Sequence, residues 1–269
     1  MGSPSLEEHE QRSGLAVLGA WLNANLMGCL AAVQFLTIAP PLVRRSFTDA
    51  ELGRAVGYFP LVGALIGAFL VGFDHLLGLF LPTGVTATLV LTGWVLCTGA
   101  LHLDGFLDSC DGLFGGRTPE DRLRIMRDER AGAFAVIGGI LLLLVKFQGI
   151  AVLSHHNAAL CLAPILGRWG MTGAVVAFPY ARPEGLGRTM KDHAGWRQAL
   201  LASAIAFVAA WVITGWLGWI LFLLSGVLMF LAVRFVLTRL PGLTGDIYGA
   251  VCELLEVLVL LGFVASERG

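Results

Sequence analysis

Long apolar runs, each about the length of a membrane-crossing helix, alternate with short polar connections along this chain. The runs lie at 15–39, 56–81, 84–103, 132–153, 156–179, 198–214, 216–233 and 247–265. A helix that crosses a bilayer needs about 20 mostly apolar residues. The pattern therefore predicts an all-α, polytopic membrane bundle of about seven to eight transmembrane helices. Asn23, Asn25 and Gln34 interrupt the first run, so this run is either a span or a helix lying at the interface.

Composition agrees with a membrane protein. Hydrophobic residues make up 57% of the chain and charged residues 14%, whereas soluble domains carry about 25% charged residues. The net charge of −1 gives no basis for binding nucleic acid. The five scattered cysteines form no CxxC pair, which argues against a disulfide framework or a zinc site. We expect one integral membrane domain over 1–269, with a polar tail at 1–14 that lacks the features of a cleaved signal peptide.

The connections between the apolar runs fall into two sets that differ in charge. The basic connections are 40–55, 104–131, 180–197 and 234–246. The connections without Lys or Arg lie around 81–84, 154–155 and 214–215. The two sets alternate along the chain, so all basic connections fall on one side of the membrane. Cytoplasmic connections carry the Lys and Arg excess, which predicts that the basic side faces the cytoplasm.

Three aspartates at the start of the acidic and arginine-rich segment 104–131 form the strongest candidate site. Asp104, Asp108 and Asp111 are spaced by four and three residues, so they share one face if the segment is helical. Like charges at this spacing repel. Gathered carboxylate oxygens suit Mg²⁺ or Ca²⁺, and Mg²⁺ commonly bridges carboxylates to substrate phosphates. A carboxylate here is also a candidate acceptor of a substrate proton.

A second acidic set opens the last apolar run. Asp246 and Glu253 are seven residues apart, and Glu256 follows three residues later, so the three share a helix face. An unpaired carboxylate in an apolar run is costly. The simplest partners are metal ions shared with the first cluster or an arginine, and a buried ion pair would explain Glu256 equally well.

Basic residues, together with Asp192, are candidates for substrate binding. The guanidinium group matches phosphate oxygens with two parallel hydrogen bonds, although the topology of the membrane explains part of the arginine excess without a substrate. The candidate substrate-binding residues are Arg117, Arg127, Arg130, Arg168, Arg182, Lys191 and Asp192. Among residues inside the predicted spans, Arg168 is expected to face a pocket, and Lys146 to extend along its span to the interface.

Two acidic clusters with neighbouring arginines are typical of phosphoryl or phosphodiester transfer, in which metal ions neutralise phosphate charge. No Walker loop, GxSxG elbow or Rossmann fingerprint occurs in the sequence, so those chemistries have no local support.

Several motifs together resemble one known family. They begin at Gln34 (QFLTIAP), Ala55 (AVGYFPLVG), His102 (HLDGFLDSCDG), Arg124 (RIMRDERAGAF), Tyr180 (YAR) and Leu243 (LTGDIYGA). With Arg168 and Glu253 they cover most of residues 30–262 in family order. The sequence resembles the cobalamin synthase family, also called adenosylcobinamide-GDP ribazoletransferase.

The resemblance implies that adenosylcobinamide phosphate is transferred from its GDP ester to α-ribazole or α-ribazole 5′-phosphate, with release of GMP. It also implies a Mg²⁺ requirement and a multi-pass position in a bacterial or archaeal cytoplasmic membrane, in contact with membrane lipid. The implied metal ligands are Asp104, Asp108, Asp111, Asp246 and Glu253. His102 and one aspartate are implied to handle the ribazole hydroxyl proton, and Arg127, Arg130 and Arg182 to contact phosphates. A homo-oligomer and an association with other cobalamin-assembly enzymes are both open.

Two other functions also fit the spans and acidic clusters. An enzyme related to the CDP-alcohol phosphotransferases would place its carboxylates at the membrane edge, but its aspartate motif is not found here. A small-solute transporter would place its site near the bilayer midplane, often between repeated halves, and no such repeat is evident.

Overall fold

The computed structural model describes residues 6–153 and 156–267, and its side chains from residue 18 onward. Its elements are α1 (Leu6–Leu36), α2 (Asp49–Ala55), the 3-10 helix η1 (Val56–Tyr58), α3 (Phe59–Gly78), α4 (Thr83–Cys97), α5 (Leu101–Gly115), α6 (Pro119–Ile125), α7 (Ala133–Ala151), α8 (Asn157–Ala177), α9 (Leu186–His193), α10 (Trp196–Thr214), α11 (Trp216–Leu237) and α12 (Gly245–Ser266). No β-strand occurs within the described ranges. The predicted all-α class is confirmed.

The number of membrane-crossing helices agrees with the prediction from the apolar runs. In the described part of the chain, seven helices are long and apolar enough to cross a membrane. The count becomes eight if α4 and α5, which are bent by 87° relative to each other, form one broken span. The chain is therefore a multi-pass membrane protein.

The prediction of one continuous span over 84–103 is wrong, because the helix breaks at residues 98–100, near the end of this run. α4 ends at Cys97. After Thr98, Gly99 and Ala100 adopt left-handed backbone angles, with φ of 59° and 57°. An L-residue pays about 1–2 kcal/mol for that conformation, and a right-handed helix cannot continue through it. The aspartate motif therefore starts a new helix, α5, which packs against α12 and α7.

The core of the bundle lies around α8, which is the most buried of the candidate spans. α3 and α12 pack against it through glycines. A Cβ atom at Gly63 of α3 would lie 2.4 Å from the carbonyl oxygen of Pro164, and one at Gly167 of α8 would lie 2.9 Å from Sγ of Cys252. Small residues let helix backbones approach closely where lipid offers no hydrophobic driving force. These contacts bring α3, α8 and α12 together.

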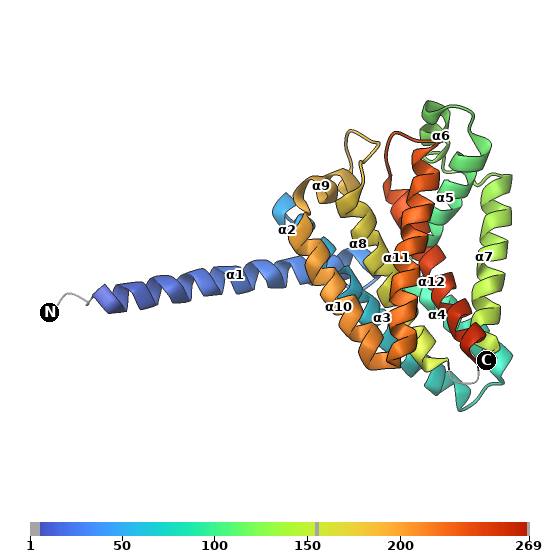
Figure 1. The fold of residues 1–269 in the computed structure, drawn as a ribbon, viewed down its shortest axis with the longest axis horizontal. Coiled ribbons are helices and arrows are strands. Elements are labelled where there is room, and N and C mark those ends of the chain that lie inside the picture. Colours follow the sequence, from blue (N-terminus) through green and yellow to red (C-terminus); the bar gives the residue numbers. More distant parts are fainter. Residues whose placement is uncertain (1–5, 154–155, 268–269) are drawn as a thin grey trace.

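The arrangement of the connections follows the alternation of charge seen in the sequence. Figure 1 shows α6, α9 and the connections that precede α9 and α12 at one end of the bundle, and the α10–α11 turn at the other end. α1 extends away from the bundle and runs across the direction of α7 and α11 (Figure 1). The basic connections thus gather at the end of the bundle where the aspartate-bearing helix α5 leads into α6.

Candidate active site

The candidate site is built by the close crossing of α5 and α12, the two helices that carry the acidic motifs. A Cβ atom at Gly105 of α5 would lie 2.8 Å from the backbone oxygen of Asp246, and one at Gly249 of α12 would lie 3.0 Å from that of His102. Contacts this short are possible only because both positions are glycine. The crossing therefore brings the first turn of α5 against the first turn of α12.

A cavity of about 640 Å³ opens beside this crossing. Five of the residues singled out in the sequence line it: His102, Asp104, Arg127, Arg182 and Asp246. They come from α5, from the segment after α6, from the connection before α9 and from α12. With Glu184, which also lines the cavity, two cationic and three carboxylate side chains share one pocket with a histidine, although up to 144 positions separate them in the sequence.

The position of Arg182 is fixed by backbone pairing between two connections. The amide of Ala181 donates to the carbonyl of Leu243 at 2.8 Å, and the amide of Leu243 donates to the carbonyl of Pro179 at 2.8 Å. This pairing places the Arg182 guanidinium beside Asp246, where Nη2 donates to Oδ2 at 2.7 Å. Charge-assisted hydrogen bonds of this kind are the strong ones, so the pair holds the mouth of the cavity in a defined shape.

The other two aspartates of α5 lie outside the lining of the cavity. Asp108 is half-buried and lies within electrostatic reach of Asp104, Asp246 and Arg182. Asp111 caps the start of α7, since Oδ2 accepts from the amide of Gly132 at 2.5 Å and Oδ1 from that of Ala135 at 2.8 Å. A carboxylate at a helix N-terminus satisfies donors that have no partner within the helix, so Asp111 has a structural role that explains its presence.

Glu253 belongs to a separate cluster of buried charges. The ammonium group of Lys146 on α7 donates to Glu253 and Glu256 of α12, and Nη1 of Arg168 on α8 donates to the other oxygen of Glu256. All four side chains are buried, and the Lys146 ammonium also lies 4.7 Å from the ring centre of Trp94. Two cations and two anions balance one another inside the bundle. We call these four residues the buried ion cluster.

The expectation that Lys146 extends along its span to the interface is wrong, because its ammonium group is satisfied inside the bundle by two carboxylates. Arg168 likewise does not line the cavity; it lies behind His102, with Glu256 on its other side. A buried charge is strongly destabilising unless a partner of opposite charge lies beside it. For Lys146 and Arg168, helices distant in the sequence supply these partners.

The buried ion cluster sets the tautomer of His102. Nη2 of Arg168 lies 3.2 Å from Nδ1 of His102. Because a guanidinium group only donates, Nδ1 is the acceptor and the imidazole proton is on Nε2. Nε2 is buried and has no hydrogen-bond partner in the described residues, and neither do the Tyr248 hydroxyl and Nε of Arg182. Buried polar atoms are rarely left unsatisfied, and all three residues line the cavity, so a polar ligand would satisfy them.

The remaining substrate-binding candidates lie away from the cavity. Arg117 and Arg130 are exposed. Nζ of Lys191 donates to the carbonyl of Val176 at 2.9 Å, and partial burial lowers the pKa of its ammonium group. Asp192 is exposed and pairs with Arg188 on the same helix at 2.8 Å. Of the basic candidates, the geometry thus favours Arg127 and Arg182 for contact with a ligand.

Two aromatic residues of the cavity were not singled out as site residues in the sequence. The rings of Tyr180 and Tyr248 lie 6.0 Å apart between centroids, and burial raises the pKa of the Tyr180 hydroxyl. Both belong to motifs that carry the family resemblance. Only the backbone pairing of residues 179–181 with residue 243 shows that the two tyrosines lie together in the lining of the cavity. Paired aromatic faces suit a flat ring system such as a nucleobase.

The donor set of the cavity suits a magnesium ion that substrate helps to bind. Among the described side chains, no group of three or more His, Cys, Asp or Glu residues is arranged to hold a metal by itself. Mg²⁺ is usually bound by one or two carboxylates together with substrate phosphates and water. The hard oxygens of the α5 and α12 aspartates, brought together by the glycine crossing, fit that mode of binding.

Comparison with known proteins identifies the family. The family described as cobalamin-5-phosphate synthase matches residues 28–264. The chain belongs to the cobalamin-5-phosphate synthase family. A relative from Pseudomonas syringae pv. syringae (strain B728a), named adenosylcobinamide-GDP ribazoletransferase, is 44% identical over 236 residues, which are 86% of this chain and 96% of the relative. A relative of the same name from Pseudomonas putida (strain GB-1) is 42% identical over 242 residues, 87% of this chain and 96% of the relative.

Membership in this family confirms the resemblance drawn from the motifs and makes the chain a transferase of cobalamin biosynthesis. Because the relatives are enzymes, the transporter hypothesis is set aside. No solved structure matches the chain.

The buried ion cluster predicts a charge-dependent stability. Glu256→Gln leaves Lys146 and Arg168 facing a single carboxylate, and removing one partner of a buried pair costs about 3–5 kcal/mol. Adding Lys146→Met restores neutrality, so we expect the double variant to unfold at a higher temperature than Glu256→Gln alone. Thermal unfolding in detergent tests this; a double variant that unfolds at the same temperature as Glu256→Gln, or at a lower one, would show that charge balance is not what the cluster maintains.

Proposed function

We propose that this chain joins adenosylcobinamide-GDP to α-ribazole, or to α-ribazole 5′-phosphate, to give adenosylcobalamin or its 5′-phosphate together with GMP. The relatives carry the name of this reaction. The observation that supports it most is the cavity at the α5–α12 crossing, which combines Asp104 and Asp246 with Arg127 and Arg182. Such a pocket suits a pyrophosphate that is attacked by a hydroxyl group.

In the proposed reaction, the guanidinium groups of Arg127 and Arg182 bind the pyrophosphate of adenosylcobinamide-GDP. The ribazole hydroxyl oxygen forms a bond to the phosphorus that carries cobinamide. The bond from that phosphorus to the bridging oxygen breaks, and GMP leaves with the bridging oxygen. The hydroxyl proton goes to a carboxylate. We assign this role to Asp104, because it lines the cavity and forms no hydrogen bond with another side chain in the described residues.

We assign His102 a role different from the one that the resemblance implies. Since Nδ1 accepts from Arg168, the ring offers only Nε2–H to the cavity. It cannot take a proton at Nε2, so we propose that it donates a hydrogen bond to a phosphate oxygen as negative charge moves during transfer. Tyr180 and Tyr248 lie on the same cavity and suit the flat base of one of the two substrates.

Magnesium is part of this proposal. Asp108 and Asp246 would hold it, together with phosphate oxygens of the substrate, and Asp108 lies within electrostatic reach of Asp246. When bound, the ion neutralises phosphate charge and stabilises the attacking and leaving oxygens. Asp111 and Glu253 are left out of this set, because Asp111 caps α7 and Glu253 pairs with Lys146.

We further propose that the cavity faces the cytoplasm in a bacterial or archaeal cytoplasmic membrane. The support is that α6 and α9, which belong to basic connections, lie at one end of the bundle (Figure 1), and cytoplasmic connections carry the Lys and Arg excess. A cysteine placed at exposed Arg117 would then react with a membrane-impermeant maleimide in inverted vesicles and not in intact cells; the opposite labelling would contradict this orientation.

The reaction predicts that detergent-purified protein with both substrates and Mg²⁺ forms cobalamin and GMP in equal amounts, and that EDTA abolishes both. Asp104→Asn should lower kcat by about 100-fold or more, because a positioned base contributes that much. Asp192→Asn, a substitution of an exposed aspartate on α9, serves as the matched control and should keep full activity. Equal activity of the two variants would rule out Asp104 as the base.

The same assay distinguishes a hydrogen-bond donor from a general base at position 102. His102→Gln places an amide N–H near the position of Nε2, whereas His102→Ala removes the donor and should lose about 100-fold in kcat. We expect His102→Gln to be clearly more active than His102→Ala and to keep the acid limb of the parent's pH profile. If the acid limb disappears in His102→Gln, the histidine acts as the base and the assigned tautomer is wrong.

A further inference from the structure

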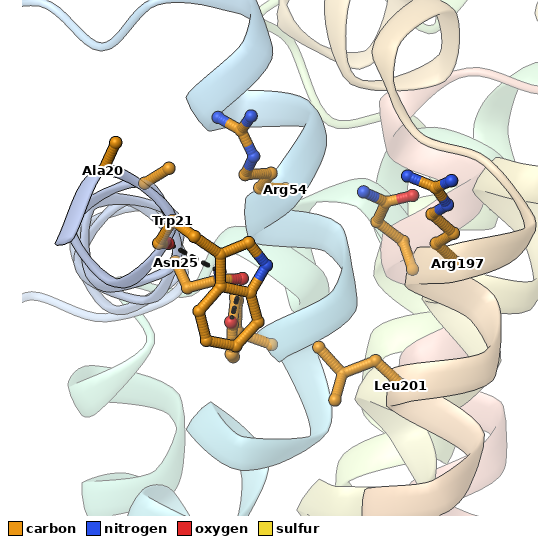
Figure 2. A pocket seen from close by; sticks show the side chains of 9 residues that line it. Ala20, Trp21, Asn25, Arg54, Arg197 and Leu201 are labelled. Carbon is orange, nitrogen blue, oxygen red and sulfur yellow. Dashed lines mark hydrogen bonds between the residues drawn. The ribbon is translucent and has the colours of Figure 1, made fainter. Parts of the chain in front are cut away.

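A second cavity, of about 490 Å³, lies between α1, the α2–η1 segment and the start of α10. Figure 2 shows its lining, with Arg54 and Arg197 on two separate helices and Trp21 and Leu201 below them in this view. None of its nine lining residues lines the cavity at the α5–α12 crossing. It is a separate site, and neither the proposed reaction nor the acidic motifs account for it.

The charged part of this cavity has two cations and no anion. Neither Arg54 nor Arg197 forms an ion pair in the part of the chain that the structure describes, and no acidic residue lines the cavity. The Arg197 guanidinium lies 5.6 Å from the ring centre of the neighbouring Trp196. Oε1 of Gln198 accepts from the amide of Gly195, which leaves its amide hydrogens free to donate. Two guanidinium groups and an amide donor form an anion-binding set.

The other polar groups of the cavity are occupied with one another. The Tyr58 hydroxyl donates to Oδ1 of Asn25 at 2.8 Å, and Nδ2 of Asn25 donates to the carbonyl of Trp21 at 2.8 Å. These bonds tie α1 to η1. They leave no acceptor among these side chains that would pair with the arginines, so an anion bound here would meet two guanidinium groups without a carboxylate partner.

The remainder of the cavity is mostly apolar, and its large apolar side chains are exposed. Trp21 is 61% exposed and Leu201 37% exposed, and Trp196 beside Arg197 is 69% exposed. Arg54 lies in the last turn of α2 and Arg197 in the first turn of α10, so both cations lie where the basic connections lead into spans. A free phosphate ion would use the guanidinium groups and leave this apolar surface unused. A phospholipid would use both parts, and anionic lipids are attracted to basic residues at the membrane surface.

The packing of α1 shows what such a lipid would do. α1 packs on α2, η1 and α3 but makes hardly any contact with α10, and the cavity is the space between α1 and α10. α1 otherwise extends away from the bundle (Figure 1). A lipid in this cavity would bridge the two helices.

We propose that the cavity between α1 and α10 binds the headgroup phosphate of an anionic phospholipid through Arg54, Arg197 and Gln198, with Trp21 and Leu201 against its acyl chains. The lipid is a structural ligand that fixes α1 against the bundle. The site is independent of the proposed reaction, so the failure of one proposal leaves the other unaffected.

The test measures lipid binding to the delipidated full chain in detergent, by native mass spectrometry and by thermal unfolding. The probes are dioctanoyl phosphatidylglycerol, dioctanoyl phosphatidylcholine and inorganic phosphate. We expect one phosphatidylglycerol to bind and to raise the unfolding temperature, and the other two probes to bind at least tenfold more weakly, because only the first combines a net negative charge with acyl chains.

Variants locate the site. Arg54→Gln with Arg197→Gln should weaken phosphatidylglycerol binding about tenfold. Arg234→Gln removes an exposed arginine on α11 that is not part of the cavity, and should bind like the parent. Arg54→Lys with Arg197→Lys keeps both charges and should retain most of the binding, which separates loss of charge from loss of fold. Equal affinity of the double Gln variant and Arg234→Gln overturns the proposal, and so does inorganic phosphate binding as tightly as the lipid.

Discussion

The close crossing of α5 and α12 is the contact on which the candidate active site depends. At Gly105 and Gly249 the two helices approach so closely that no side chain fits between them. Each helix carries an acidic motif at its start, and the crossing is what turns two separate motifs into one pocket. In a bilayer, helices gain little from burying apolar surface against each other, and close packing of small residues takes over. The shape of the candidate active site therefore depends on the packing at these two glycines.

The buried ion cluster supports this crossing from inside the bundle. Lys146, Arg168 and the two glutamates of α12 connect three helices through charges that would be very costly alone. The cluster also reaches the site, because Arg168 holds His102 in the tautomer that offers Nε2–H to the cavity. A charge network that appears purely structural thus orients a residue of the proposed catalytic pocket.

The sequence predicts the helices better than it predicts which side chains meet. Apolar runs of sufficient length follow from bilayer thickness, so the spans could be located within a few residues. The break in the run over 84–103 could not, since Gly99 and Ala100 are both compatible with a continuing helix and only their left-handed backbone ends it. The partners of Lys146 are more than 100 positions away, and no local pattern reports them. For the same reason, periodicity placed Asp104, Asp108 and Asp111 on one face but gave no sign that Asp111 caps α7.

The central claim is that carboxylates of α5 and α12 bind one divalent ion together with the substrate. Electron paramagnetic resonance of Mn²⁺, used as a stand-in for Mg²⁺, measures this directly in detergent-purified protein with adenosylcobinamide-GDP. We predict one bound ion, with an affinity that falls in both Asp108→Asn and Asp246→Asn but stays unchanged in Asp192→Asn. If Mn²⁺ binds to all three variants as tightly as to the parent, the two acidic motifs do not form a shared metal site and the proposed chemistry at the crossing is wrong.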